Sequence, residues 1–359
     1  MSAATPAERD DAQFASALLA WYDHHGRKDL PWQRERTPYR VWISEIMLQQ
    51  TQVRTVIGYF ERFVADLPTL ADLAHAGEDR VLALWSGLGY YSRARNVLRA
   101  AKLCIERHGG ELPRDIDGLA ALPGIGRSTA AAILAQAHGE RHAILDGNVR
   151  RVLARFHGVR GWSGRPAVQR ILWEHAERHT PGHRVADYTQ AIMDLGATLC
   201  TRSRPLCAEC PVSNACIAWR DGLVGELPEP RPRRAVPTRA TAMLVVVDAH
   251  GRILLERRPP AGVWARLWSL PESDAAADPA ARLESAYGIR ARHVRTFDAF
   301  VHAFTHYHLR ITPRLLASAG PEAAIADGAD HAWFARADLR SLGLPAPVRR
   351  LLETLEEHR

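Results

Sequence analysis

The stretch LPGIGRSTAAAILA, residues 122–135, places a Gly-x-Gly turn directly before a helical pattern. Glycine lets a backbone pass close to a bulky ligand, and the free amides at a helix N-terminus point toward an anion. Gly124 and Gly126 are therefore candidates for binding a phosphate of a nucleic acid backbone. An ordinary turn between two helices has the same composition. The turn is not a dinucleotide-binding fingerprint, because no strand precedes it and the third glycine is missing.

A second motif follows in ILDGNVRRVLARF, residues 144–156, where Asp146 and Asn148 stand immediately before another helical pattern. Aspartate is a favoured N-cap, so its simplest role is to begin the helix. On its own, this motif does not require a catalytic role for Asp146.

A third motif, CTRSRPLCAECPVSNAC, covers residues 200–216 and contains four of the five cysteines: Cys200, Cys207, Cys210 and Cys216. Zinc sites usually use two close pairs of ligands that lie far apart, and only Cys207 and Cys210 form such a pair. Four thiolates in one short loop suit an iron–sulfur cluster, although the spacing alone leaves zinc open. Cys104 lies on a separate helical segment and is expected to be a buried core thiol.

The chain has 359 residues, of which 47% are apolar, and a net charge of +7. This length and composition predict two folded domains. The charge favours a polyanionic partner such as nucleic acid, but an arginine-rich solvated surface would carry the same charge. No apolar run approaches the roughly eighteen residues of a membrane span, and the start MSAATPAERDD has no apolar signal segment. We therefore expect an intracellular protein with no membrane partner and clustered cysteines that bind metal.

Apolar residues recur at helical spacing from residue 11 to about residue 220, so residues 1–225 are predicted to form a mainly helical domain. Residues 226–240 are rich in proline and arginine and are predicted to be a linker. Residues 241–359 change to a mixed α and β pattern. We expect strands at 242–248 and in ILLERR (253–258), another strand over 297–311, and a terminal helix at 346–357.

The order of the three motifs resembles the helix-hairpin-helix DNA glycosylases that carry a 4Fe-4S cluster. Two branches of that superfamily compete: the endonuclease III-like glycosylase/lyases and the MutY-type adenine DNA glycosylases. A lyase needs a lysine amine near the reacting sugar, and Ser128 stands where endonuclease III-like proteins have it. Lys28 and Lys102 are the only lysines in the chain, and arginine stays protonated.

Two further features resemble the MutY branch. In VWISEIMLQQTQV, residues 41–53, Glu45 stands among apolar residues that would raise its pKa and keep it protonated. The chain also continues for more than 140 residues beyond the cysteines, with a domain similar to the Nudix-like C-terminal module of that family. In the R-E-x-x-E-E-x-G box of a Nudix hydrolase, aligned on Gly288, Ala281 stands at the arginine position and Arg282, Ser285 and Ala286 stand at the three glutamate positions. The metal-binding carboxylates are therefore missing, so we expect a recognition domain and no second hydrolase.

The resemblance implies that the substrate is adenine mispaired with 8-oxoguanine or guanine in duplex DNA. It implies that Glu45 protonates the flipped adenine and that Asp146 stabilises the oxocarbenium-like sugar. Asn148 would orient Asp146 or the sugar-phosphate, and Ser128 would lie near the same site. Arg150 stands where some relatives have a lysine, so we expect weak strand cleavage or none.

The same resemblance assigns further residues to DNA. Gln50 and Thr51 would probe the partner base, and Leu88 and Tyr90 would fill the vacated stack. Phe304, Thr305 and His306 correspond to a Phe-Ser-His loop that senses 8-oxoguanine, with Thr305 in place of the serine. His302, His306 and His308 could also form a zinc site, but they lack a spaced partner pair.

Two other interpretations remain open from the sequence: an endonuclease III-like lyase on oxidised pyrimidines, or a non-catalytic iron–sulfur DNA-binding sensor. A pure DNA-binding protein does not need Glu45 and Asp146, which repel phosphate. We expect a monomer in the bacterial cytoplasm, associated with the nucleoid.

Overall fold

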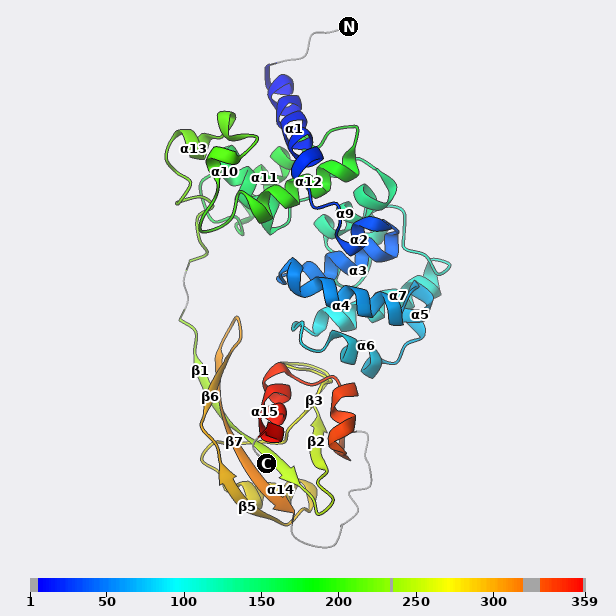
Figure 1. The fold of residues 1–359 in the computed structure, drawn as a ribbon, viewed down its shortest axis with the longest axis vertical. Coiled ribbons are helices and arrows are strands. Elements are labelled where there is room, and N and C mark those ends of the chain that lie inside the picture. The colour runs from blue at the N-terminus through cyan, green and yellow to red at the C-terminus, as the bar shows by residue number, and fades with distance from the viewer. Residues whose placement is uncertain (1–5, 233–234, 319–329, 358–359) are drawn as a thin grey trace. The chain divides into compact units, whose positions relative to one another are not determined.

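The glycine turn ends α8 (Ile116–Ala121) and begins α9 (Arg127–His138) in the computed structural model, which describes residues 6–232, 235–318 and 330–357 (Figure 1). Gly124 has a φ of +81°, a left-handed conformation that residues with a side chain rarely adopt. Gly126 is the N-cap of α9, and its carbonyl accepts the first helical hydrogen bond from Ala130 at 2.9 Å. The helix-turn-helix predicted from residues 122–135 is therefore present.

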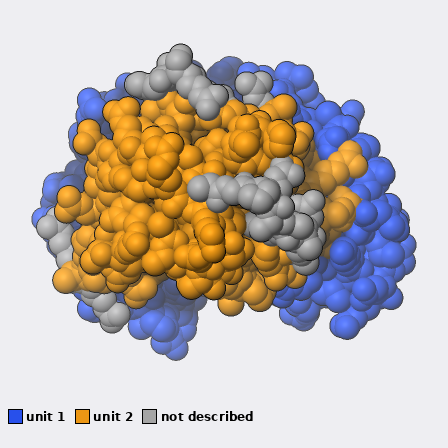
Figure 2. Space-filling model, turned by 90° about the horizontal axis from the view of Figure 1, so that it is seen from below, with its two compact units in different colours: residues 1–75, 99–233 blue, residues 76–98, 234–359 orange. Residues whose placement is uncertain are grey.

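The chain divides into two compact units, which Figure 2 shows in different colours. Residues 1–75 and 99–233 form the first, here called the helical unit. Residues 76–98 and 234–359 form the second, here called the sheet unit. No helix of the described residues is long and apolar enough to cross a membrane.

The helical unit is built almost entirely from α-helices, as the sequence predicted. They are α1 (Pro6–His25), α2 (Pro31–Arg34), α3 (Pro38–Leu48), α4 (Val53–Asp66), α5 (Leu70–His75), α8, α9, α10 (Gly147–Phe156), α11 (Pro166–His179), α12 (Val185–Thr198) and α13 (Ile217–Arg220). Helix α7 (Ser92–Arg107) begins in the sheet unit and ends in the helical unit. Short 3-10 turns at Cys207–Glu209 and Ser213–Ala215 lie in the cysteine loop.

Helix α9 is the centre of the packing that positions the site. It contacts α3, α8 and α12, and its residues 130–135 are all buried. Four of those six residues are alanines, and small side chains let neighbouring helices approach closely. Helix α10 buries an apolar stripe against α12, and Phe156 meets Phe14 of α1 edge-to-face at 4.8 Å. The starts of α9 and α10 are thereby fixed relative to α3.

The sheet unit contains an eight-stranded sheet whose main path runs β3-β2-β1-β7-β5, with β4, β6 and β8 paired to it at the sides. The strands are β1 (Thr238–Val247), β2 (Ile253–Arg257), β3 (Trp268–Ser269), β4 (Glu272–Ser273), β5 (Ala291–Thr296), β6 (Phe300–Ala303), β7 (His308–Ser318) and β8 (His331–Phe334). Its helices are α6 (Glu78–Trp85), α14 (Pro279–Tyr287) and α15 (Ala346–Glu357), with a 3-10 turn at Arg336–Ser341. Strand β1 pairs in parallel with β7, from Thr238 opposite His308 to Val247 opposite Ala317.

The predicted hairpin at 242–258 and the predicted terminal helix at 346–357 are present, with Val247 opposite Ile253. The single strand expected over 297–311 is wrong. The chain instead turns between β6 and β7, and the amide of Phe304 donates to the carbonyl of Tyr307 at 2.9 Å. Phe304, Thr305 and His306 therefore lie in a tight turn and not in a strand.

The segment 76–98 is held within the sheet unit by contacts with residues far along the chain. The Tyr91 hydroxyl donates to the carbonyl of Leu344 at 2.9 Å, and Arg95 Nη1 donates to the carbonyl of Ala265 at 2.6 Å. Asp79 forms an ion pair with Arg257 at 2.7 Å. These bonds join α6, the turn after it and the start of α7 to the sheet.

Candidate active site

Glu45 and Asp146 line one cavity of about 730 Å³ in the helical unit, here called the carboxylate cavity. Glu45 comes from α3, and Asp146 comes from the residue before α10. The structure brings further residues that the sequence singled out to the same cavity: Gln50, Thr51, Ser128 and Asn148. Gly124 and Gly126 do not line it; they belong to the turn at the start of α9.

The environment of Glu45 favours its protonated form. Burial is the larger cause and the nearby negative charge of Asp146 the smaller one, and they raise the pKa of this carboxyl to about 7. One hydrogen bond acts in the opposite direction: Gln136 Nε2 on α9 donates to Glu45 Oε1 at 3.1 Å. Three neighbours of Glu45 on its own helix, Ile43, Ile46 and Met47, are buried apolar residues. Glu45 can therefore carry a proton near neutral pH.

Asp146 has a different environment, because it is the N-cap of α10. Its Oδ1 accepts from the backbone amides of Asn148 at 3.1 Å and Val149 at 2.8 Å, and its Oδ2 accepts from Asn148 Nδ2 at 3.2 Å. Burial raises the pKa of Asp146 above its usual value, and these amides and the charges of Arg151 and Arg150 offset only part of that rise. The N-cap role suggested by the sequence is confirmed, and the carboxylate still lines the cavity.

Ser128 helps to position the segment that carries Asp146. Its hydroxyl accepts a hydrogen bond from the backbone amide of Leu145 at 3.0 Å. This bond joins the first turn of α9 to the residue that immediately precedes Asp146. Arg150 also lines the cavity, whereas neither lysine of the chain does.

Sequence reasoning missed Arg151, which connects Asn148 to the cysteine loop. Arg151 Nη2 donates to Asn148 Oδ1 at 2.8 Å, and Arg151 Nε donates to the carbonyl of Cys200 at 2.6 Å. It also missed Gly196 on α12, where an added Cβ would lie 2.6 Å from Asn148 Cβ. A glycine inside a helical pattern often marks a close approach between two helices. Gly196 could have been found in the sequence by this signal.

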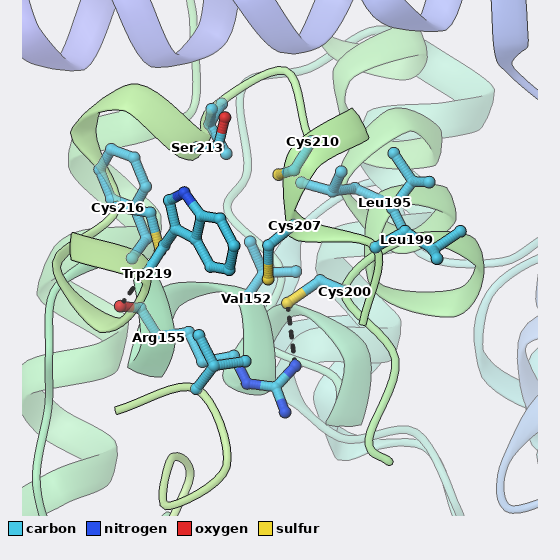
Figure 3. A pocket seen from close by; sticks show the side chains of 14 residues that line it. Val152, Arg155, Leu195, Leu199, Cys200, Cys207, Cys210, Ser213, Cys216 and Trp219 are labelled. Atoms are coloured by element: carbon cyan, nitrogen blue, oxygen red, sulfur yellow. Dashed lines mark hydrogen bonds between the residues drawn. The ribbon is translucent and has the colours of Figure 1, made fainter. Parts of the chain in front are cut away.

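The four clustered cysteines line one largely apolar pocket, the cysteine pocket, which Figure 3 shows from close by. Val152, Leu195 and Leu199 contribute to its wall, and the guanidinium of Arg155 donates to Cys200 Sγ at 3.4 Å. Burial raises the pKa of the Cys210 thiol to about 11 and also raises those of Cys207 and Cys216. Burial therefore favours the protonated thiol at these three positions when no cation is bound. Within the part of the chain that the structure describes, no three His, Cys, Asp or Glu side chains converge on one metal ion.

A second group of predicted residues lies in the sheet unit. Tyr90, Phe304, Thr305 and His306 line a cavity of about 420 Å³, here called the aromatic pocket, together with Trp264 and His302. The ring of Trp264, which the sequence did not single out, lies 5.2 Å from that of Phe304. Tyr90 is 46% exposed, whereas Leu88 is only 6% exposed. Of the two expected wedge residues, only Tyr90 is therefore accessible in this structure.

Comparison with known proteins agrees with this arrangement. Residues 43–178 match the HhH-GPD superfamily of base excision DNA repair proteins, and residues 242–354 match the NUDIX domain. A thermostable thymine-DNA glycosylase of known structure is 28% identical and aligns with a TM-score of 0.54, covering 59% of this chain and 98% of its own. The helical fold is that of a helix-hairpin-helix base-excision repair protein.

Relatives that match both units show which family of base-excision repair proteins this chain belongs to. The adenine DNA glycosylase of Buchnera aphidicola subsp. Acyrthosiphon pisum is 33% identical over 96% of this chain and 98% of its own length. The human adenine DNA glycosylase is 33% identical over 96% of this chain and 74% of its own length. The chain therefore belongs to the adenine DNA glycosylase family.

The close approach of α12 to α10 gives a first prediction. Gly196→Ala places a methyl group against Asn148 and should lower the free energy of unfolding by about 1–3 kcal/mol, as overpacking does. Urea denaturation followed by circular dichroism measures this change. Gly182→Ala is the matched control, since a Cβ there meets no atom within 4 Å. Equal stability of the two variants would show that Gly196 is not needed for helix packing.

Proposed function

We propose that the protein hydrolyses the N-glycosidic bond of adenine mispaired with 8-oxoguanine, or with guanine, in duplex DNA. One observation carries the proposal: the carboxylate cavity contains two carboxyl groups in different environments. The pKa of Glu45 is raised to about 7, whereas Asp146 caps a helix N-terminus whose amides offset part of the rise that burial causes. Pairs of carboxyls whose environments differ in this way divide acid and charge-stabilising roles between them.

Glu45 is the general acid of the proposed mechanism. Adenine must leave the base stack before any side chain can reach it, so the base is flipped into the cavity. Proton donation from Glu45 to N7 converts adenine into a good leaving group and leaves the Glu45 carboxylate. That carboxylate can then take a proton from the attacking water.

Asp146 stabilises the sugar cation that forms as the glycosidic bond breaks. The amides of Asn148 and Val149 fix its carboxylate, and the N-terminus of α10 favours its negative charge. Asn148 in turn is held by Arg151, so the carboxylate is positioned before the substrate arrives.

We infer that no lyase step follows. A Schiff base requires a neutral amine close to the sugar, and the residues that line the cavity include no lysine. Lys28 Nζ instead donates to the backbone carbonyl of Asp23 at 2.7 Å. Ser128 and Arg150 cannot replace an amine nucleophile. The product is therefore an intact strand with an abasic site.

The cysteine pocket would hold a 4Fe-4S cluster through Cys200, Cys207, Cys210 and Cys216. The four thiols line one pocket, and their close spacing in one loop suits a cluster better than the two separated pairs of a zinc site. With four protein ligands the cluster would supply structural cross-linking of the loop. Arg155 would assist by donating to Cys200 Sγ and to the carbonyl of Thr201.

Recognition of the partner base is assigned to residues 241–359, and base excision to residues 1–225, with residues 226–240 as the linker. Support comes from the aromatic pocket, where Phe304, Thr305 and His306 lie together with Tyr90. Ala281, Arg282, Ser285 and Ala286 on α14 offer no metal-binding carboxylate, so Nudix hydrolysis is not expected.

We propose that the protein acts as a monomer on DNA in the bacterial cytoplasm.

The Asp146→Asn substitution tests the catalytic role while keeping the N-cap, because asparagine caps helices as well as aspartate. It should reduce adenine excision opposite 8-oxoguanine by roughly 100-fold or more and leave DNA binding intact. A labelled duplex, treated with and without hot alkali, measures excision. Asp221→Asn, a change at an exposed carboxylate in the same unit, is the control. If the unaltered protein cleaves the strand without alkali, it is an endonuclease III-like lyase. If the unaltered protein binds the duplex but excises no base, it is a non-catalytic DNA-binding sensor.

The raised pKa of Glu45 gives a pH prediction. Glu45 acts in its protonated form, so the single-turnover excision rate should hold below about pH 7 and fall about tenfold per pH unit above it. Glu45→Gln should remove most of the activity at every pH. A rate that increases through neutral pH would contradict the assignment of Glu45 as the acid.

The turn between β6 and β7 gives a specificity prediction. Replacing both Thr305 and His306 by alanine should lower the preference for A:8-oxoguanine over A:G by about tenfold, the effect of losing one or two hydrogen bonds. The ratio of kcat/KM for the two duplexes measures it. The matched control replaces Thr296 and His293 of β5, which bond to each other at 3.0 Å and do not line the aromatic pocket. An unchanged ratio would refute the assignment.

A further inference from the structure

A continuous chain of hydrogen bonds runs through the interior of the helical unit and ends at Glu45. It begins at Asp194 and passes through three glutamines, Gln190, Gln33 and Gln136, which are 3%, 8% and 5% exposed. The residues come from α12, α2 and α9, and Glu45 comes from α3 (Figure 1). Buried side-chain amides usually have all their polar atoms bonded. Gln33 Oε1 is an exception, because it has no hydrogen-bond partner among the described residues, so the arrangement of this chain calls for a physical explanation.

The far end of the chain is anchored by an ion pair. Asp194 is completely buried, and its Oδ1 accepts from Arg27 Nε at 2.9 Å and Nη2 at 2.6 Å. Its Oδ2 accepts from the backbone amide of Arg27 at 2.8 Å. An ionised carboxylate can only accept hydrogen bonds. Asp194 therefore requires a donor from its remaining neighbour, Gln190.

This requirement fixes the direction of every amide in the chain. Gln190 turns its Nε2 toward Asp194 Oδ1, at 2.7 Å, which leaves its Oε1 facing Gln33. Gln33 Nε2 then donates to Gln190 Oε1 at 2.5 Å and to Gln136 Oε1 at 3.1 Å.

Gln136 is the last amide of the chain. Because its Oε1 is occupied by Gln33, its Nε2 must face Glu45. Reversal of any one amide would place two donors or two acceptors against each other.

We propose that Gln136 is a positioning residue for Glu45, because it holds an amide N–H on the carboxyl throughout the reaction. Asp194 determines that orientation from the far end of the chain, through Gln190 and Gln33. This inference rests on the proposed role of Glu45 as the general acid.

The consequence concerns the charge that Glu45 acquires when it gives up its proton. Burial and Asp146 both oppose a negative charge on Glu45, and a carboxyl that resists ionisation is a poor proton donor. The N–H of Gln136 is a charge-assisted donor to that carboxylate and needs no rearrangement when the charge appears. Gln136 therefore makes Glu45 a stronger acid than its apolar surroundings alone would allow.

The other charged groups around Glu45 do not replace this donor. Arg27, Asp146, Arg150 and Arg151 are the ionisable residues that line the cavity with it. Arg27 is engaged by Asp194, while Arg150 and Arg151 lower the pKa of Asp146. Among the described residues, none of these arginines donates a hydrogen bond to Glu45. The donor to Glu45 is Gln136, which lies on α9, a helix that packs against α3.

The test is the pH dependence of single-turnover adenine excision, from about pH 5 to about pH 9, on the labelled A:8-oxoguanine duplex. Gln136→Leu removes the donor and keeps a similar volume. The descending limb should move to higher pH by about one unit, since a hydrogen bond to a charged group is lost. Asp194→Asn should move it in the same direction without altering Gln136, because asparagine can face the chain with either end. Gln33→Leu interrupts the chain midway and replaces Asp194→Asn if that variant does not fold.

Gln169→Leu on α11 is the matched control, with the same substitution outside the chain, and should leave the limb in place. If the descending limb of the pH profile does not shift in Gln136→Leu, Gln136 only contributes to packing and the proposal is overturned. This holds even if the overall rate of that variant is lower. An equal shift in Gln169→Leu would overturn it too. Glu45→Gln distinguishes a failure of the acid role of Glu45 from a failure of the positioning role of Gln136. If the descending limb of the pH profile persists in Glu45→Gln, Glu45 is not the acid, and the proposal for Gln136 fails as well. If the limb disappears there but is unshifted in Gln136→Leu, this proposal alone fails.

Discussion

The repulsion between two carboxyl groups in one cavity is the constraint around which the helical unit is arranged. Two like charges in a poorly solvated space cannot both ionise freely, so their surroundings must differ. Asp146 is surrounded by donors and cations: two backbone amides, the side chain of Asn148 and two arginines. Glu45 has apolar neighbours and one amide. The difference depends on how α3, α9 and α10 meet, so the packing of these helices determines the surroundings of each carboxyl.

The cysteine loop is connected to this site indirectly, through hydrogen bonds of Arg151 and Asn148. Arg151 bonds to both the carbonyl of Cys200 and the side chain of Asn148, and Asn148 bonds to Asp146. Two side chains therefore connect Cys200 to the carboxylate of Asp146. Gly196 lets α12 pass close enough for this connection to form. The loop can influence the geometry of Asp146 through rigid hydrogen bonds alone.

The sequence predicted those parts of the molecule that depend on local pattern. The hairpin, the N-cap at Asp146, the strands at 242–258 and the terminal helix depend on residues adjacent in the chain, and all are present. The tight turn at Phe304 was missed, because alternation continues on both sides of it. The glutamine chain was also missed, since Gln33, Gln136 and Gln190 are more than fifty residues apart and no periodicity connects them. Their role depends on tertiary contacts between four helices.

The composition of the sheet unit has a consequence for the order of folding. Residues 76–98 belong to it, yet the bond from the Tyr91 hydroxyl to Leu344 spans 253 positions in the chain. During synthesis, that bond cannot form until the end of the chain has left the ribosome. Domains generally fold as units as they emerge, and contacts of such separation close slowly. The stretch around α6 therefore reaches its native contacts only after residues more than 250 positions further along the chain have been made.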